Sequence, residues 1–193
     1  LFLFVDILAK KLFRMKPDSF EIVDDYKFDE FVCWVQLTNN SNYYLLGMKS
    51  GLAILDIRTS ELSYINNKIP NKPSQRLNDS FVDQIGRIWY GTMEHGPSDD
   101  FMSVLANYSS NMAKPIIVDD GYGITNGPII NQDQTVLYHT DSQRGIVYKF
   151  TLQPKEPILI EKEVFLQFNP TVAVPDGMCF DKDGNIYIAI WGG

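Results

Sequence analysis

The sequence predicts an all-β protein made of repeated small antiparallel sheets, as in a β-propeller. Three observations lead to this prediction. Helical periodicity is scarce, short apolar runs rich in β-branched and aromatic residues recur, and the starts of these runs are 41, 44, 49 and 49 residues apart. A period of about 40–50 residues that carries several short strands is typical of propeller blades. Each blade needs a neighbour on both sides to bury its two faces.

The strands expected from this pattern form two sets. The inner strands of successive blades are predicted at Leu3–Asp6, Tyr44–Gly47, Ile88–Gly91, Leu137–Thr140 and Ile186–Ala189. A second strand is predicted after each of the first four, at Lys11–Met15, Leu52–Asp56, Ser103–Tyr108 and Ile146–Phe150. A β-sandwich is the alternative architecture, but a sandwich requires no self-similar period.

Turn-forming sequences precede the last four inner strands. They are Asn39–Asn42, Gln84–Arg87, Asn131–Gln134 and Asp181–Asn185. Asn, Asp and Gly favour such turns because their side chains or backbones adopt the required conformations. The segment Asp181–Gly184 also resembles the start of an EF-hand loop. It lacks the closing glutamate and precedes a strand, so we predict a hairpin turn there.

The five inner strands correspond to about four blades, so we expect residues 1–193 to be a single, incomplete propeller domain. The chain opens on apolar residues from Leu1 and stops at Trp191-Gly192-Gly193. A propeller closes by pairing its first and last blades, because an open stack leaves unpaired edges. We therefore expect these residues to be part of a longer chain.

Composition excludes several classes of protein. With 45% hydrophobic residues the chain is too apolar to be disordered, and no stretch reaches the roughly 20 apolar residues of a membrane-spanning helix. A net charge of −7 disfavours nucleic-acid binding and favours cations. Cys33 and Cys179 lie in apolar runs. We expect two buried thiols in a reducing compartment, which indicates the cytoplasm.

Polar residues recur at one position of the repeat. Asn78, Asn126 and Asp176 each lie ten residues before the start of an apolar run. Equivalent positions on successive blades would form a ring around the propeller axis. Amide and carboxylate oxygens suit a hard cation, with Ca²⁺ expected and Zn²⁺, Mg²⁺ and Mn²⁺ left open. The alternative is that Asn and Asp before Gly are ordinary turn residues. Trp34 occupies the position in the second blade, so that blade would not ligate.

Arg76, His95 and His139 are three further candidates for the site. Arg76 precedes Asn78 by two residues, and its planar guanidinium could hold a substrate carbonyl or hydroxyl groups at the channel mouth. The alternative for Arg76 is an ordinary surface position. His95 is expected in a surface loop and His139 is expected to be structural. The sequence contains no Gly-x-Ser-x-Gly elbow and no phosphate-binding loop.

Three segments resemble motifs of the gluconolactonase and senescence-marker-protein (regucalcin) family, which includes the insect luciferin-regenerating enzyme. They are Arg76–Asp83 with Gly86-Arg87 and Gly91-Thr92-Met93, then Ile124–Gly127, then Val174–Cys179 with the following strand. Leu3–Ile7 with Ala9-Lys10-Lys11 also resembles the first blade of the family. The segments occur in the family's order and span nearly the whole chain.

The resemblance implies a six-bladed, calcium-dependent propeller that hydrolyses lactones. It implies metal ligation by Asn126 and Asp176 together with a glutamate whose place precedes Leu1. It also implies substrate contacts from Arg76 and Asn78. Glu94 is the acid nearest to a further substrate contact expected after Gly-Thr-Met, although its spacing differs from the family's. The family's Gly and Lys after Asn-Asp are replaced by Ser80 and Phe81 in this sequence. The resemblance does not assign a role to Asp79.

The predicted function is therefore a metal-dependent hydrolase that opens sugar-type lactones, with Asp176 taking a proton from water. The predicted partner is a small-molecule lactone, without nucleic acid or membrane, and the oligomeric state is not predicted. One alternative is a non-enzymatic calcium- or ligand-binding propeller of the regucalcin kind. Another is a protein-interaction propeller of the WD or Kelch type, which would have no polar ring in its channel.

Overall fold

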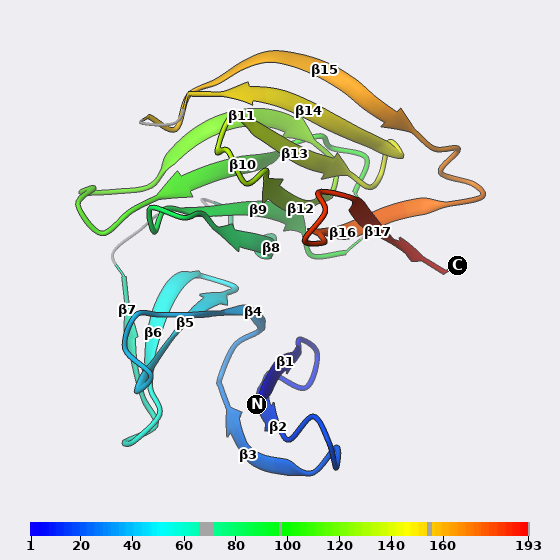
Figure 1. The fold of residues 1–193 in the computed structure, drawn as a ribbon. Coiled ribbons are helices and arrows are strands. Elements are labelled where there is room, and N and C mark those ends of the chain that lie inside the picture. The colour runs from blue at the N-terminus through cyan, green and yellow to red at the C-terminus, as the bar shows by residue number, and fades with distance from the viewer. Residues whose placement is uncertain (66–71, 97, 154–155, 193) are drawn as a thin grey trace. The chain divides into compact units, whose positions relative to one another are not determined.

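The structure is a computed structural model that describes residues 1–65, 72–96, 98–153 and 156–192, and these residues form strands and turns without a helix (Figure 1). The strands are arranged in five small antiparallel sheets in which neighbours are consecutive in the chain. The first sheet contains β1 (Phe2–Asp6), β2 (Lys11–Met15) and β3 (Ile22–Lys27), and the second contains β4 (Val32–Leu37), β5 (Tyr43–Met48), β6 (Gly51–Asp56) and β7 (Glu61–Tyr64).

The third sheet contains β8 (Gln75–Val82), β9 (Ile88–Glu94), β10 (Ser103–Tyr108) and β11 (Ile116–Tyr122). The fourth contains β12 (Thr125–Ile130), β13 (Val136–Asp141), β14 (Ile146–Leu152) and β15 (Leu159–Gln167), and the fifth is the hairpin of β16 (Val174–Phe180) and β17 (Ile186–Trp191). Four separate meanders and a hairpin differ from the two facing sheets of a β-sandwich, so the alternative architecture is wrong. The number of blades and the single-domain organisation stay predictions.

The chain divides into two compact units, Leu1–Leu77 and Asn78–Gly193. In the first unit the core is formed by side chains from β2, β4, β5 and β6, among them the fully buried Leu12, Leu46 and Leu55. In the second unit Trp89 and Leu105 pack with Leu137 and Phe150 from the next sheet. Burial of these apolar side chains between neighbouring sheets is the main stabilising contribution in each unit.

All nine predicted strands are present, but four of the five predicted inner strands are not the first strands of their sheets. The runs at Tyr44, Ile88, Leu137 and Ile186 form β5, β9, β13 and β17, and each follows another strand of the same sheet. The preceding strands β8, β12 and β16 lack the apolar pattern because they carry polar, Gly and Pro residues. The predicted hairpin turn at Asp181–Gly184 is confirmed, because the Asp181 carboxylate accepts the backbone N–H groups of Asp183 and Asn185.

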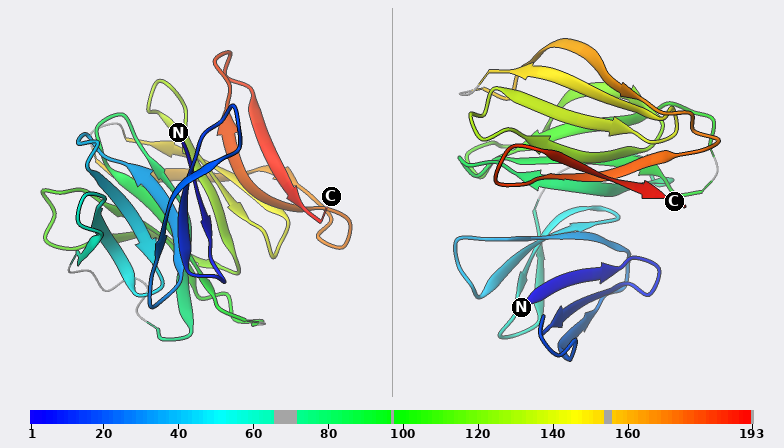
Figure 2. Two further views of the ribbon diagram at one scale, coloured as in Figure 1. Left: turned by 90° about the horizontal axis from the view of Figure 1, so that it is seen from below. Right: turned by 45° about the vertical axis from the view of Figure 1, so that its right-hand side comes forward.

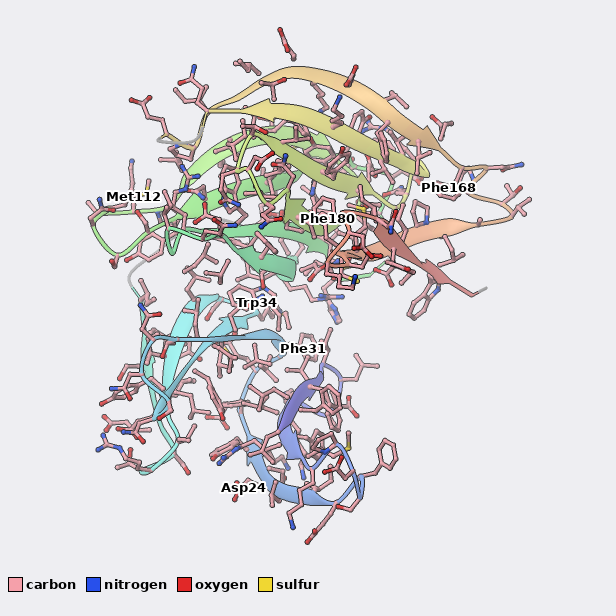
Figure 3. All side chains as sticks on the ribbon, viewed as in Figure 1. Asp24, Phe31, Trp34, Met112, Phe168 and Phe180 are labelled. Atoms are coloured by element: carbon pink, nitrogen blue, oxygen red, sulfur yellow. The ribbon has the colours of Figure 1, made fainter. Side chains whose placement is uncertain are left out.

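The prediction of two buried thiols is right for Cys33 and wrong for Cys179, which is exposed. Side chains alternate between the two faces of a strand. Phe180 (labelled in Figure 3) packs against Tyr138 of the neighbouring sheet, with 5.9 Å between the ring centroids. Cys179 therefore points to the opposite face of β16. The cytoplasmic location stays a prediction. No helix in the described part of the chain is long and apolar enough to cross a membrane.

The turn between β8 and β9 is closed by a buried ion pair. Asp83 Oδ2 accepts from Arg87 Nε at 2.6 Å and from Trp89 Nε1 at 3.0 Å, while Asp83 Oδ1 accepts the Arg87 backbone N–H at 2.9 Å. The two charged side chains are 0% and 6% exposed. Gly86 adopts φ +83° within this turn, a conformation that favours glycine.

We expect Asp83→Ala to lower the free energy of unfolding of the full-length protein by about 3–5 kcal/mol, because it leaves a buried guanidinium without its counter-ion. Denaturant unfolding measures the change. Asp133→Ala is the matched control in the next first-to-second-strand turn, where the side chain is exposed. The control should change stability by about 0.5 kcal/mol or less. Equal losses in the free energy of unfolding for the two variants would show that the buried ion pair does not contribute more to stability than an exposed turn residue.

Candidate functional site

The recurring polar residues lie inside strands, so the alternative that they are turn residues is wrong. Asn78 belongs to β8, Asn126 to β12 and Asp176 to β16. Each of these strands is the first of its sheet. In the second sheet the first strand is β4, which contains Trp34 (labelled in Figure 3). The ten-residue spacing therefore placed each of the four residues in the first strand of its sheet.

Two of the three strands carry a β-bulge at the polar position. In β12, Gly127 and Pro128 together oppose one residue of β13, His139. In β16, Asp176 and Gly177 together oppose one residue of β17, Ala189. A bulge interrupts the ladder and redirects nearby side chains and backbone groups, and bulges are frequent beside functional sites. The repeated bulge explains why Gly follows the polar residue in both strands.

The two bulges lie against each other in the second unit, where the β16–β17 hairpin (orange to red) lies beside the sheet of β12–β15 (Figure 2). A Cβ atom added to Gly127 would lie 2.7 Å from the Met178 backbone nitrogen and 3.2 Å from Gly177 Cα. Gly127 also has φ +47°. Only glycine meets both requirements without strain. This close approach brings the residues that precede the two glycines, Asn126 and Asp176, to the same part of the molecule.

A chain of hydrogen bonds joins β8 to β12. Asn78 Nδ2 donates to the Thr125 carbonyl oxygen and to Asn126 Oδ1, both at 2.7 Å. Asn126 Nδ2 donates in turn to Ser142 Oγ at 2.8 Å. Asn126 is 7% exposed and Ser142 is 3% exposed. Two of the predicted site residues are thus in direct contact, and the orientation of both amides is defined by their partners.

Asp79 also links the strands. Its Oδ2 accepts the Gly127 N–H at 2.7 Å, and its Oδ1 accepts the Ser80 N–H at 2.8 Å. Burial raises the pKa of the Asp79 carboxyl group. The two N–H donors oppose this rise, and the nearby negative charge of Asp176 adds to it. Asp79 is therefore a half-buried residue whose carboxyl group lies near a second carboxylate, and it holds the bulge of β12 in place.

The donor set fits a hard cation in part. Asn126 Oδ1 keeps a second lone pair beyond the bond from Asn78. The half-buried Asp176 carboxylate forms no hydrogen bond or ion pair with a residue that the structure describes. Ca²⁺ takes about six to eight oxygen ligands, so the remaining ligands would come from water, substrate or other protein oxygens. The described ranges contain no group of three His, Cys, Asp or Glu side chains placed to hold a metal.

The other predicted residues have different surroundings. Arg76 lies two residues before Asn78 in β8 but belongs to the first unit, and its Nη1 donates to the Leu77 carbonyl at 2.9 Å. Its substrate role stays a prediction. Glu94 is the half-buried last residue of β9, and it forms no hydrogen bond with Asn78, Asn126 or Asp176 in the described structure. His95 is exposed just after β9, as predicted.

His139 is structural, as predicted, and lies directly opposite the bulge of β12. It is fully buried and packs edge-on against Tyr122, with 4.7 Å between the ring centroids. Burial lowers the pKa of His139 to about 3 from an ordinary value of 6.5. The ring is consequently neutral over the physiological pH range.

Sequence reasoning did not assign roles to Asp79 and Ser142. Asp79 stood within a resembling motif, and an acid next to a candidate ligand was a usable signal. Ser142 follows Asp141 at the end of β13 and carries no signal of its own, because its role depends on the register between β12 and β13.

The fold and the site together define an all-β protein of small antiparallel sheets, with oxygen-bearing side chains gathered on the first strands of adjacent sheets. The chain belongs to the family described as SMP-30/Gluconolactonase/LRE-like region, whose model matches residues 1–193. This result confirms the family that the sequence motifs indicated.

Two relatives illustrate the similarity. The chain is 25% identical over 190 residues to the YvrE protein of Bacillus subtilis. This match covers 98% of the chain and 63% of that protein. It is 31% identical over 126 residues to the pentonolactonase XacC of Haloferax volcanii. This match covers 65% of the chain and 42% of that protein. The chain therefore spans less than two thirds of the length of these curated relatives.

Solved structures support the fold. A luciferin-regenerating enzyme superposes with a TM-score of 0.88 at 22% identity, over 97% of this chain and 64% of that one. A regucalcin from Agrobacterium tumefaciens, described as a calcium-binding protein, superposes with a TM-score of 0.85 at 20% identity, over 96% of this chain and 62% of that one.

We expect His139 to make the full-length protein less stable at acidic pH. The unfolded chain binds a proton near pH 6.5, whereas the folded protein keeps His139 neutral down to about pH 3. Stability is therefore lost as the pH falls from 6.5 towards 3. At pH 4 the loss from this group is on the order of 3 kcal/mol relative to neutral pH.

The measurement is denaturant unfolding at several pH values for the parent and for His139→Leu. As the pH falls from 6.5 towards 3, the free energy of unfolding of the parent should decrease relative to that of His139→Leu. His95→Gln, which alters the exposed histidine, should leave the pH dependence unchanged. Parallel pH curves for the parent and His139→Leu would contradict the assignment.

Proposed function

We propose that the full-length protein is a metal-dependent hydrolase that opens sugar-type lactones, with Ca²⁺ as its cation. One observation carries the proposal: Asn126 and Asp176 occupy bulged first strands that lie against each other, and Asn126 is hydrogen-bonded to Asn78. The family match and the similarity to a pentonolactonase support the reaction class. The six-bladed propeller expected from the resemblance is part of the same proposal.

The reaction adds water to the lactone carbonyl carbon and breaks the ring C–O bond of the ester. A proton is lost from the attacking water and one is gained by the released hydroxyl oxygen. A bound divalent cation would supply Lewis-acid stabilisation of the negative charge that develops on the carbonyl oxygen. Asn126 Oδ1 and the Asp176 carboxylate would hold it.

The residues of this chain supply the remaining steps. The Asp176 carboxylate, which has no hydrogen-bond donor among the described residues, takes the proton from water. Asn78, which is fixed by Thr125 and Asn126, orients the substrate from β8. Arg76 and Glu94 are proposed as further substrate contacts. Asp79 keeps the β12 bulge closed through the Gly127 N–H.

We expect Asp176→Asn and Asn126→Ala each to lower kcat/KM for D-glucono-1,5-lactone by about 100-fold or more in the full-length protein, because each removes a ligand and Asp176→Asn also removes the base. A pH-stat assay with CaCl₂ or with a chelator measures the rate. Asp183→Asn, in the exposed turn of the same β16–β17 hairpin, is the control and should retain activity. Full calcium-dependent activity in either site variant would overturn the proposal.

The second candidate is a calcium-binding propeller without turnover. The similarity to the Agrobacterium regucalcin described as calcium-binding favours it, as do Ser80 and Phe81, which replace the Gly and Lys of the resembling motif. The same assay separates the two functions. Calcium binding that raises thermal stability without lactone hydrolysis would select this second candidate.

A further inference from the structure

We propose that Ser142 is a positioning residue that fixes the Asn126 amide in the orientation required for cation binding. The inference rests on the proposed metal-dependent function and assigns a role to a residue outside the candidate ligand set. Ser142 lies immediately after β13, in the turn that leads to β14. It acts through Asn126, because its Oγ accepts the Asn126 Nδ2–H at 2.8 Å.

The direction of the hydrogen bonds in this network is determined by the Thr125 carbonyl group, which can only accept a hydrogen bond. The Thr125 carbonyl receives a hydrogen bond, so the Asn78 atom that faces it is the amide nitrogen. The same nitrogen donates to Asn126, so the Asn126 atom that faces Asn78 is Oδ1. Asn126 Nδ2 consequently points away from Asn78, and on that side it needs an acceptor. Ser142 Oγ is that acceptor.

Burial makes the Ser142 contact decisive. Asn126 is 7% exposed and Ser142 is 3% exposed, so water has little access to the amide nitrogen if the hydroxyl is removed. A buried donor without an acceptor is costly. The side chain then relieves this cost by rotating away, which also moves Oδ1. Removal of a partner that orients a metal-ligating side chain typically weakens the affinity for the metal by about 10- to 100-fold.

The turn around Ser142 is itself well anchored. The Ser142 N–H donates to the Ile124 carbonyl at 2.9 Å, and the Ser142 carbonyl accepts the Gly145 N–H at 3.1 Å. Arg144 Nη1 donates to Asp141 Oδ2 at 2.8 Å and to the Gly121 carbonyl at 2.6 Å. The backbone of Ser142 is therefore held in place by contacts that a substitution of its side chain leaves intact.

Thr140 offers a matched control two residues earlier. Thr140 pairs with Asn126 in the register of β12 and β13. It is fully buried, and its Oγ1 has no hydrogen-bond partner within the part of the chain that the structure describes. Thr140→Val removes a buried hydroxyl from the residue that pairs with Asn126, without removing a side-chain hydrogen bond to Asn126.

The test is calorimetric titration of the chelator-treated full-length protein with CaCl₂ alone. We expect Ser142→Ala to weaken the affinity for Ca²⁺ by about 10- to 100-fold, Ser142→Thr to restore it by keeping a hydroxyl, and Thr140→Val to leave it unchanged. Thermal unfolding of the calcium-free proteins identifies variants that are merely misfolded. A role limited to stability would lower the melting temperature of Ser142→Ala without changing its Ca²⁺ affinity, and this result would overturn the inference.

Asn126→Ala separates failure of the inference from failure of the proposed function. If Asn126→Ala loses Ca²⁺ affinity while Ser142→Ala keeps it, the positioning role is wrong and the metal site stands. If Asn126→Ala binds Ca²⁺ as tightly as the parent, both the proposed metal site and the role of Ser142 are wrong.

Discussion

The hydrogen bond from the Gly127 N–H to Asp79 is the interaction on which the site depends. The bulge in β12 removes this N–H from the β12–β13 ladder, and a buried backbone donor needs another acceptor. Asp79 Oδ2 provides it at 2.7 Å from the neighbouring sheet. The same bulge lets β16 approach within van der Waals contact of Gly127. One bond across two sheets therefore permits the irregular backbone that brings Asn126 near Asp176.

A cost accompanies this arrangement. Two carboxyl groups, Asp79 and Asp176, lie near each other, and burial together with the Asp176 charge raises the pKa of Asp79. Like charges in a site of low polarity oppose joint ionisation. A cation held by Asp176 would offset this repulsion. Occupation of the proposed cation site would therefore ease the ionisation of Asp79 beside Asp176.

The strands predicted from the sequence are those whose residues are apolar and β-branched, because such side chains pack in the sheet interiors. The first strands β12 and β16 were missed for a physical reason. β12 contains Gly127 and Pro128, and β16 contains Pro175 and Gly177, residues that usually indicate turns. Bulges tolerate both. Counting ten residues back from a recognisable strand still led to Asn78, Asn126 and Asp176 in the first strands β8, β12 and β16, because a short hairpin connection keeps the first strand a few residues before the second.

Contacts between sheets could not be predicted in this way. The exposure of Cys179 depends on which face of β16 meets Tyr138, and the role of Ser142 depends on the register of two strands. Neither is encoded in the local pattern. The amide network shows why such contacts matter: a carbonyl of Thr125, which can only accept, determines through Asn78 which atom of Asn126 faces the site. Backbone polarity in one strand therefore determines which atoms of Asn78 and Asn126 face each other, and the Ser142 hydroxyl accepts the last hydrogen bond of the network.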